Sequence, residues 1–359
     1  MRIRLEVILI LLGSATAEAH SDGSASTPDS ARVAVQASES RVVLRAPKVS
    51  GYVQLRYRNA PATSASSRFD GDELSVARLR VSIDGDIAAR VSYEIEFDPR
   101  ATSIAGLLRD AFVTFKLFPR HELRLGQQKT QFGYENRESS GNLFTVNRAE
   151  VSDALARGPS VLDVGVGLIG DLSLANGVTL EDATTVVNGN GPNAPSDDTP
   201  RKSAWGRWGL RYRSGSHKLG ARLGVSGGTG DWVDAGNDPL DAADDERRDF
   251  ARVGADLELD HPRFFLSAEY LSGKETNHAT AALRKSRGYY VSLVGKSPWR
   301  IGPTVRYEEF DAKLRRWTVG TFLGLPAETL RAMVNYELRT GNGGVRGDDR
   351  LYLWAQVRF

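Results

Sequence analysis

The sequence predicts an all-β protein in which sixteen antiparallel strands form a transmembrane β-barrel. Short segments alternate apolar and polar residues with a period of two, which is typical of strands whose two faces meet different surroundings. Short and long connections alternate between these segments, so the two ends of the sheet differ. The polar face is rich in Gly and Arg, whereas a water-exposed sheet would mix Lys and Glu freely.

The N-terminal residues have the pattern of a secretory signal peptide over residues 1–19. Two arginines precede the apolar run "VILILLGSA", and the small residues of "ATAEA" provide cleavage sites, so we expect cleavage after Ala19. The run is too short for a spanning helix, which needs about 20 apolar residues. Residues 20–48 are rich in Ser, Ala and Asp, and we expect a flexible linker there.

The barrel is expected to occupy residues 49–359. Its sixteen alternating segments begin near residues 49, 73, 88, 106, 120, 160, 176, 203, 216, 248, 262, 285, 299, 313, 328 and 348. Tight connections such as "DGD", "FPRH" and "DHPR" fall between longer ones such as "APATSASSRFDG" and "NGNGPNAPSDDTPRK". A soluble sandwich or propeller would also alternate, but its strands are shorter, and no blade repeat is visible in this sequence.

The alternation also predicts which face each side chain occupies. In "WGRWGLRYR", the apolar set that contains Trp208 and Leu210 alternates with Arg207 and Arg211. A charged residue on the lipid face near the midplane costs about 2–4 kcal/mol, so a one-residue slip would be prohibitive for several arginines together. We therefore expect apolar side chains to face lipid and arginines to face inward. Aromatic residues near strand ends suit the interfacial girdles of such barrels; these are Tyr57, Phe97, Tyr212, Phe264, Tyr270, Tyr307 and Tyr336.

The segment "LYLWAQVRF" predicts a last strand that closes the barrel against the first, because a closed barrel leaves no free edge. Its apolar residues at alternate positions and its terminal Phe359 also resemble the assembly signal of bacterial outer-membrane proteins. That resemblance implies a bacterial outer membrane and insertion by the barrel assembly machinery.

Three stretches together resemble the phosphate-selective porin O and P family. They are "ELSVARLRVSIDGDIAARVSYEIEFD", "LLRDAFVTFKLFPRHELRLGQQKTQFGYENRESS" and "LDVGVGLIGDL", and the likeness is strongest over residues 73–172. The family implies a sixteen-stranded, usually trimeric porin whose third loop folds into the lumen as a constriction. Residues 131–159 would be that loop, with "NRAEVSDALA" as a short helix inside it. Lys129 and Glu135 match the family's "GQ.K" lysine and its following acidic residue.

The expected function is passive diffusion of small anions, phosphate or polyphosphate among them, through an Arg-lined pore. Rings of Arg and Lys select anions, and the planar guanidinium suits phosphate. The predicted pore-lining residues are Arg56, Arg58, Arg78, Arg80, Arg124, Lys129, Arg207, Arg211, Arg213, Lys218 and Arg222.

Two alternatives stay open at this point. Several acids share the inward phase, which also fits a general, weakly selective porin; they are Glu94, Glu96, Asp98, Asp110, Asp163, Asp256 and Glu258. Long acidic, Gly-rich loops would also suit a non-conducting barrel with a surface or adhesion role.

No enzymatic activity is expected. The chain has 5 His and 0 Cys, and no two His have the spacing of a metal site, so we expect no metal and no cofactor. The "GVSGG" match to G-x-S-x-G lies where a strand enters a loop, and the motif needs a strand, a turn and a helix.

A net charge of +2 gives no indication of nucleic acid as a partner. The expected partners are inorganic anions such as phosphate, outer-membrane lipid and lipopolysaccharide, the assembly machinery, and further copies of the chain in a homotrimer.

Overall fold

The computed structural model describes most of the chain from residue 46 onward. The described residues are 46–59, 72–101, 104–156, 161–194, 197, 199, 201–214, 219–234, 246–312, 314–341 and 349–359. The expected signal peptide and nearly all of the expected linker lie outside these residues.

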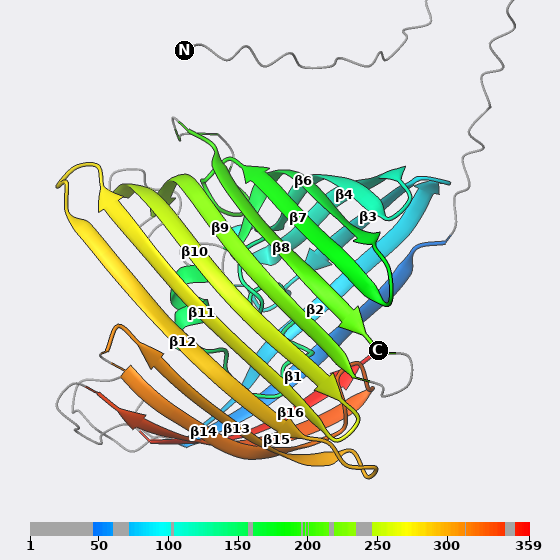
Figure 1. Ribbon diagram of the computed structural model, residues 1–359, viewed down its shortest axis with the longest axis vertical. Helices are drawn as coiled ribbons and strands as arrows, with labels where there is room; N and C mark the ends of the chain where they lie inside the picture. The colour runs from blue at the N-terminus through cyan, green and yellow to red at the C-terminus, as the bar shows by residue number, and fades with distance from the viewer. Residues whose placement is uncertain are drawn as a thin grey trace, which may run out of the picture. The chain divides into compact units, whose positions relative to one another are not determined.

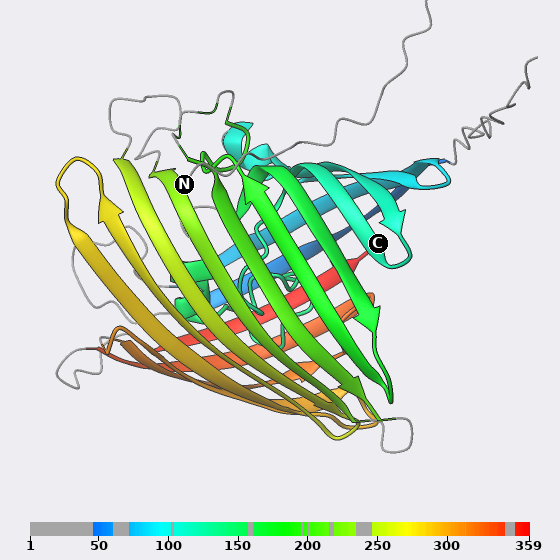
Figure 2. The same cartoon turned by 45° about the horizontal axis from the view of Figure 1, so that its top comes forward.

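Within the described residues, sixteen strands form one closed antiparallel barrel in which each strand pairs with its neighbours in sequence (Figures 1 and 2). The strands are β1 (Lys48–Asn59), β2 (Glu73–Ala88), β3 (Val91–Phe97), β4 (Leu108–Phe118), β5 (His121–Lys129), β6 (Leu162–Ser173), β7 (Val178–Val187), β8 (Ser203–Arg213), β9 (Gly220–Asp234), β10 (Glu246–His261), β11 (Phe264–Asn277), β12 (Leu283–Gly295), β13 (Ile301–Phe310), β14 (Leu314–Leu323), β15 (Leu330–Thr340) and β16 (Arg350–Arg358). The predicted fold class is confirmed, and most strand starts fall within a few residues of the expected ones.

The barrel closes where β1 meets β16. The backbone N–H of Gly51 donates to the Phe359 carbonyl at 2.9 Å, and the N–H of Phe359 donates back to the Gly51 carbonyl at 3.1 Å. On the inner face, the side-chain amide of Gln54 donates to the Oε1 atom of Gln356, directly opposite it in the register, at 2.8 Å. Both glutamines are fully buried, so an amide pair holds the seam on its lumenal side.

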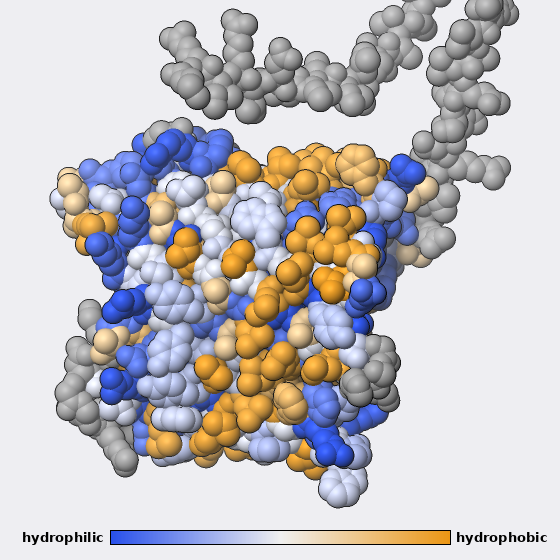
Figure 3. Space-filling model, viewed as in Figure 1, coloured by the Kyte–Doolittle hydropathy of each residue, from blue (hydrophilic) through white to orange (hydrophobic). Residues whose placement is uncertain are grey.

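The side chains alternate between the two faces as the sequence predicts. On β8, Trp208, Leu210 and Tyr212 are 45%, 48% and 42% exposed, whereas Arg207, which directly precedes them, is 1% exposed. The exposed residues form the apolar outer surface, which Figure 3 shows as orange across the middle of the view. Because a lipid-facing charge is costly, this alternation fixes the register of the barrel in the membrane.

The connections differ between the two ends of the barrel. Turns at one end are short, as at residues 89–90, 119–120 and 262–263. The other end carries the longer connections, including residues 60–72 and 130–161. An exception is the β13–β14 connection, residues 311–313, which the sequence also marks as irregular.

The loop between β5 and β6 carries much of the buried apolar surface inside the barrel. Phe132 of the loop packs against Trp205 of β8 with ring centroids 5.4 Å apart, and Trp205 stacks on Phe250 of β10 at 4.5 Å. The loop also forms the short helix η1 (Ser152–Ala156), where the sequence predicts a helix. The third loop is therefore folded inward and rests on the barrel wall.

The helices of the described residues are short. Apart from η1, they include α1 (Ile104–Leu107), which precedes β4. No helix in the described part of the chain has the length and apolar character needed to cross a membrane.

Candidate functional site

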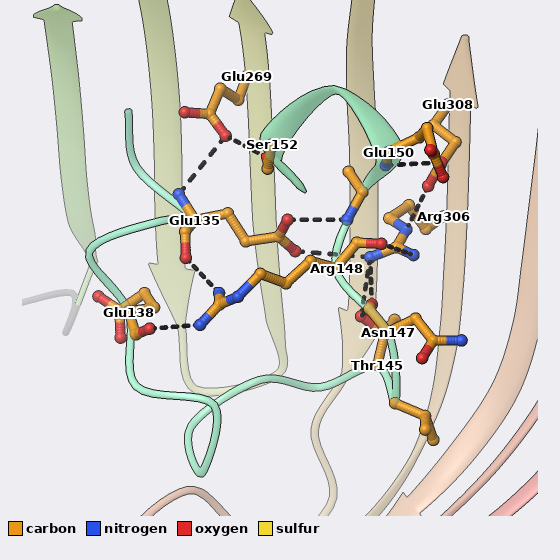
Figure 4. Close-up of polar contacts among 12 residues, drawn as sticks. Glu135, Glu138, Thr145, Asn147, Arg148, Glu150, Ser152, Glu269, Arg306 and Glu308 are labelled. Carbon is orange, nitrogen blue, oxygen red and sulfur yellow. Dashed lines mark hydrogen bonds and ion pairs between the residues drawn. The ribbon is translucent and has the colours of Figure 1, made fainter. Parts of the chain in front are cut away.

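Carboxylates of the barrel wall hold the third loop by accepting hydrogen bonds from its backbone (Figure 4). Glu269 of β11 accepts from the Tyr134 N–H at 2.6 Å and from the Ser152 hydroxyl at 3.0 Å. Glu308 of β13 accepts from the Glu150 N–H at 3.0 Å. Because both side chains are buried, these hydrogen bonds fix the start and the helical end of the loop.

Arginines hold the middle of the loop by donating hydrogen bonds to it. Arg306 of β13 donates to the Thr145 hydroxyl and to the Asn147 carbonyl, both at 2.9 Å. Arg148, on the loop itself, donates to the Glu138 carbonyl at 2.7 Å and closes the loop on itself. Figure 4 shows Arg306 reaching the loop from its strand and Arg148 crossing between two segments of the loop. The loop thus has one defined position in the lumen.

Glu135, the acid that the family resemblance singles out, belongs to this anchoring network. Its carboxylate accepts from the Ala149 N–H at 2.8 Å and lies 3.5 Å from the guanidinium of Arg306. Its role here is structural, because it joins the two arms of the loop across the turn.

A polar cavity of about 800 Å³ lies between the loop and the wall formed by β1–β9. Its basic lining residues are Arg78, Arg80, Arg109, Arg120, Arg124, Lys129, Arg137, Arg148, Arg207 and Arg222. Its acidic lining residues are Glu94, Glu96, Asp110, Glu122, Glu138, Asp171, Glu181 and Asp182. Within the described residues, the lining therefore carries ten basic and eight acidic side chains.

The structure brings part of the predicted site together in this cavity. The predicted residues that line it are Arg78, Arg80, Arg124, Lys129, Arg207 and Arg222. Arg56, Arg58, Arg211 and Arg213 lie on the same strands but are not among its lining residues. Lys218 lies outside the described residues.

The arginines of β8 and β9 are neutralised by acids from the flanking strands. Glu181 of β7 lies 3.0 Å from Arg211, 3.1 Å from Arg222 and 3.8 Å from Arg207. Arg207 also forms a two-point ion pair with Asp256 of β10, at 2.9 and 2.5 Å. Neither β8 nor β9 supplies these acids, which is why the two strands alone suggest an unopposed basic column.

A second set of arginines has amide or carbonyl partners instead of acids. Arg78 donates to the Gln54 Oε1 atom at 3.0 Å, and Arg137 donates to the Gln131 Oε1 atom at 2.9 Å. Arg148 donates to loop carbonyls and a serine hydroxyl. A neutral partner does not cancel a positive charge. In the part of the chain that the structure describes, none of these three arginines lies within ion-pair distance of a carboxylate.

The loop arginine Arg137 lies among charges of both signs. Burial, followed by the nearby charge of Arg207, lowers its pKa to about 10, while Glu181 acts in the opposite direction. Arg78 and Arg148 likewise repel one another across the cavity. Because the described lining carries two more basic than acidic side chains, its net positive charge can attract an anion that enters the cavity.

Four of the cavity's basic residues were not predicted: Arg109, Arg120, Arg137 and Arg148. Arg137 and Arg148 lie in "NRESS" and "VNRAE", inside the segment that was expected to fold into the lumen. Every charged side chain of that segment is therefore a candidate for the cavity lining, and the period of the strands gives no means of choosing between them.

A second space of about 440 Å³ lies on the other side of the loop. It shares Tyr134 and Glu138 with the larger cavity and reaches Lys296 and Leu325 in the short connections at the opposite end. The larger cavity also reaches that end at Arg120, so both spaces extend toward the end of the barrel that carries the short turns.

A closed sixteen-stranded barrel with an inward third loop over a charged lumen is the architecture of an outer-membrane porin. Residues 48–185 match the sequence model of the family described as phosphate-selective porin O and P, which confirms the resemblance seen in the sequence. No curated protein sequence gives a significant match.

Solved porin structures share the fold at low sequence identity. The outer-membrane expressed OmpT of Vibrio cholerae is 11% identical with a TM-score of 0.59, over 88% of this chain and 100% of that one. The anion-selective porin from Comamonas acidovorans is 14% identical with a TM-score of 0.58, over 88% and 99%. OmpT folded in vitro, in its trimer form, is 10% identical with a TM-score of 0.60, over 88% and 99%. At such identities these structures support the fold, and the family match and the barrel favour a channel over an enzyme.

Proposed function

We propose that the protein is an outer-membrane porin through which small anions, phosphate among them, diffuse passively. The observation that supports this most is the set of lumenal arginines without a carboxylate partner: Arg78, Arg137 and Arg148. They come from β2 and from the third loop, on opposite sides of the same cavity. An anion passing the loop would meet guanidinium groups from both sides.

The chemistry of the guanidinium suits transit of an oxyanion. Its fork of donors matches two oxygens of a phosphate at once, whereas an ammonium acts as a point charge. Transit also requires that an anion leave as readily as it enters, which several weak sites in series achieve better than one tight site. The polar cavity, with its charges spread along the lining, supports this proposal.

A general, weakly selective porin is the second candidate, and the acidic lining supports it. Glu181 neutralises arginines on β8 and β9, and Arg80 is paired with Glu96 at 3.3 Å and with Asp98. In this reading most of the arginines stabilise the wall. The two candidates predict different signs and sizes of ion selectivity.

The proposal extends to assembly and export. We infer a homotrimer in the outer membrane, reached after cleavage of an N-terminal signal peptide and inserted by the barrel assembly machinery. The trimer form of OmpT, which shares the fold, supports this oligomeric state. Native mass spectrometry of protein extracted from outer membranes would test both the oligomer and the mass of the mature chain.

The experiment that tests the function is ion selectivity in planar lipid bilayers. In a KCl gradient, the reversal potential of the wild-type channel should have the sign of chloride preference, and phosphate added on one side should reduce the chloride current. The double variant Arg78→Gln/Arg137→Gln should move the reversal potential toward zero. Arg315→Gln, which removes an exposed arginine from β14, is the matched control and should leave the potential unchanged. A wild-type channel that prefers potassium would overturn the proposal.

A further inference from the structure

A row of cross-strand pairs on the outer face of β11 and β12 is ordered by chemistry. From the β11–β12 connection toward the middle of the barrel, the directly opposed pairs are Lys274 with Lys285, Ser272 with Arg287, Tyr270 with Tyr289, Ala268 with Val291, and Leu266 with Leu293. The row passes from cationic through aromatic to aliphatic side chains.

This order places the lysine pair at the level of lipid headgroups. Tyr and Trp mark the membrane interface in such barrels. Tyr270 and Tyr289 are 44% and 38% exposed. The lysines lie four residues beyond them, about 14 Å along a tilted strand. The end of the barrel with the longer connections faces the outside of the cell in proteins of this class, so the pair faces the outer leaflet.

The lysine pair destabilises the sheet unless a negatively charged group lies between its two positive charges. Like charges directly opposite each other on one face of a sheet destabilise it. Lys274, Lys285 and Arg287 are all exposed, and within the described residues none of them forms an ion pair with a carboxylate. By contrast, Arg315 on β14 is also exposed but has Glu309 at 3.6 Å. The three cations thus lack the acid partner that a neighbouring outer-face arginine has.

The same three residues line a groove of about 640 Å³ on the outer surface. Its floor includes the small side chains of Ala251 and Ser272, which leave room beside the cations. Asp311 also lines the groove; its carboxylate accepts a hydrogen bond from the Arg287 backbone N–H at 2.7 Å and so does not occupy the guanidinium.

We propose that this groove binds a phosphate group of the phosphorylated glycolipid in the outer leaflet. Lys274 and Lys285 would hold the phosphate between them, Arg287 would contact it from the next pair, and the acyl chains would lie over the Tyr270–Tyr289 pair and the aliphatic pairs beyond. Two opposed ammonium groups and a guanidinium match a phosphomonoester at this depth, and the apolar surface below matches its acyl chains.

The test uses the full protein in nanodiscs that contain bis-phosphorylated lipid A in a phosphatidylcholine background. Native mass spectrometry should show wild-type protein that retains lipid A, and Lys274→Gln/Lys285→Gln should reduce the retained fraction about tenfold, corresponding to about 1.4 kcal/mol. The control Arg263→Gln/Arg315→Gln removes two exposed arginines outside the groove and should retain lipid A like the wild type. Heat-modified mobility on gels verifies that each variant is folded.

Three outcomes would overturn the proposal. The first is equal retention of lipid A by the lysine variant and the wild type. The second is equal retention of lipid A from which both phosphates have been removed, because acyl packing alone would then explain binding. The third is retention of phosphatidylglycerol to the same degree, because the groove would then accept any anionic lipid. Loss of lipid A on addition of inorganic phosphate alone would support the assignment of phosphate as the recognised group.

Discussion

Arg207 and Asp256, on β8 and β10, face each other across β9 and form a two-point ion pair in which both side chains are 1% exposed. Removal of one partner would leave a buried, uncompensated charge, which costs about 3–5 kcal/mol. We therefore expect Arg207→Gln to lower the unfolding temperature markedly. The measurement is heat-modified mobility on gels, and Asp256→Asn together with Arg207→Gln should recover part of the loss. Equal stability of the single variant and the wild type would contradict this role.

Arg78 and Arg80 are adjacent inward-facing arginines on β2 that differ in their partners. Arg78 has the Gln54 amide, whereas Arg80 has two carboxylates. Arg78→Gln should therefore reduce the ratio of chloride to potassium permeability more than Arg80→Gln does. A unit charge near 4 Å in water contributes about 1 kcal/mol, so we expect a change of at least about fivefold for the Arg78 variant. The prediction is tested by measuring the reversal potentials of the two variants in the same KCl gradient. Equal shifts for Arg78→Gln and Arg80→Gln would contradict the proposed anion path.

Arg207, Arg211 and Arg222 belong to the predicted pore-lining set, and the ion pairs around Glu181 give a way to test their part in selectivity. If the three arginines are compensated, Glu181→Gln should increase anion preference, because it releases positive charge into the cavity. The size of the change should be comparable to that of Arg78→Gln, with the opposite sign. An unchanged reversal potential in Glu181→Gln would show that these residues lie off the ion path.

The third loop should lose its fixed position when Glu269 is replaced. Glu269→Ala removes the acceptor for the Tyr134 N–H and the Ser152 hydroxyl, and each buried donor left without an acceptor costs about 1–3 kcal/mol. We expect noisier single-channel currents and a broader distribution of conductance. Ser152→Ala, which removes one of the two bonds, should show a smaller change. Recordings in which Glu269→Ala is as quiet as the wild type would mean that the remaining contacts suffice.

The network of Arg306, Arg316, Glu308 and Glu337 should couple the loop to the stability of the barrel. Arg316 lies 2.6 Å from Glu308 and 3.4 Å from Glu337, and it also donates to the Arg148 carbonyl of the loop at 2.8 Å. Arg316→Gln leaves two buried carboxylates short of a partner and should cost about 3–5 kcal/mol. A double-mutant cycle between Arg316→Gln and Glu308→Gln should give a coupling energy of about 0.5–3 kcal/mol. Strict additivity would exclude a shared network.

The fold was predictable because one strong physical constraint acts on every strand. A residue such as Leu210 must face lipid and one such as Arg207 must not, so the period of two fixes the register without knowledge of the partner strand. The seam between β1 and β16 follows from the same constraint, since a barrel in lipid cannot leave an edge unpaired.

The site was predictable only in part, because selectivity depends on pairs that form between strands and with the loop. The sequence marks Arg78 and Arg207 alike as inward arginines. Only the structure shows that Gln54 faces the first and Asp256 the second. The arginines of the third loop are even harder to assign from the sequence, since a loop has no period from which the direction of Arg137 or Arg148 can be inferred.

The pairing of β1 with β16 has a consequence for biogenesis. These two strands are separated by nearly the whole length of the barrel sequence, so the contact between them is the most non-local in the molecule. Until β16 has been synthesised and brought beside β1, both strands expose unsatisfied backbone groups that can pair with any other extended chain. For the exported chain that we propose, we therefore expect that these edges need shielding before insertion and that closure of the cylinder is a late step of folding.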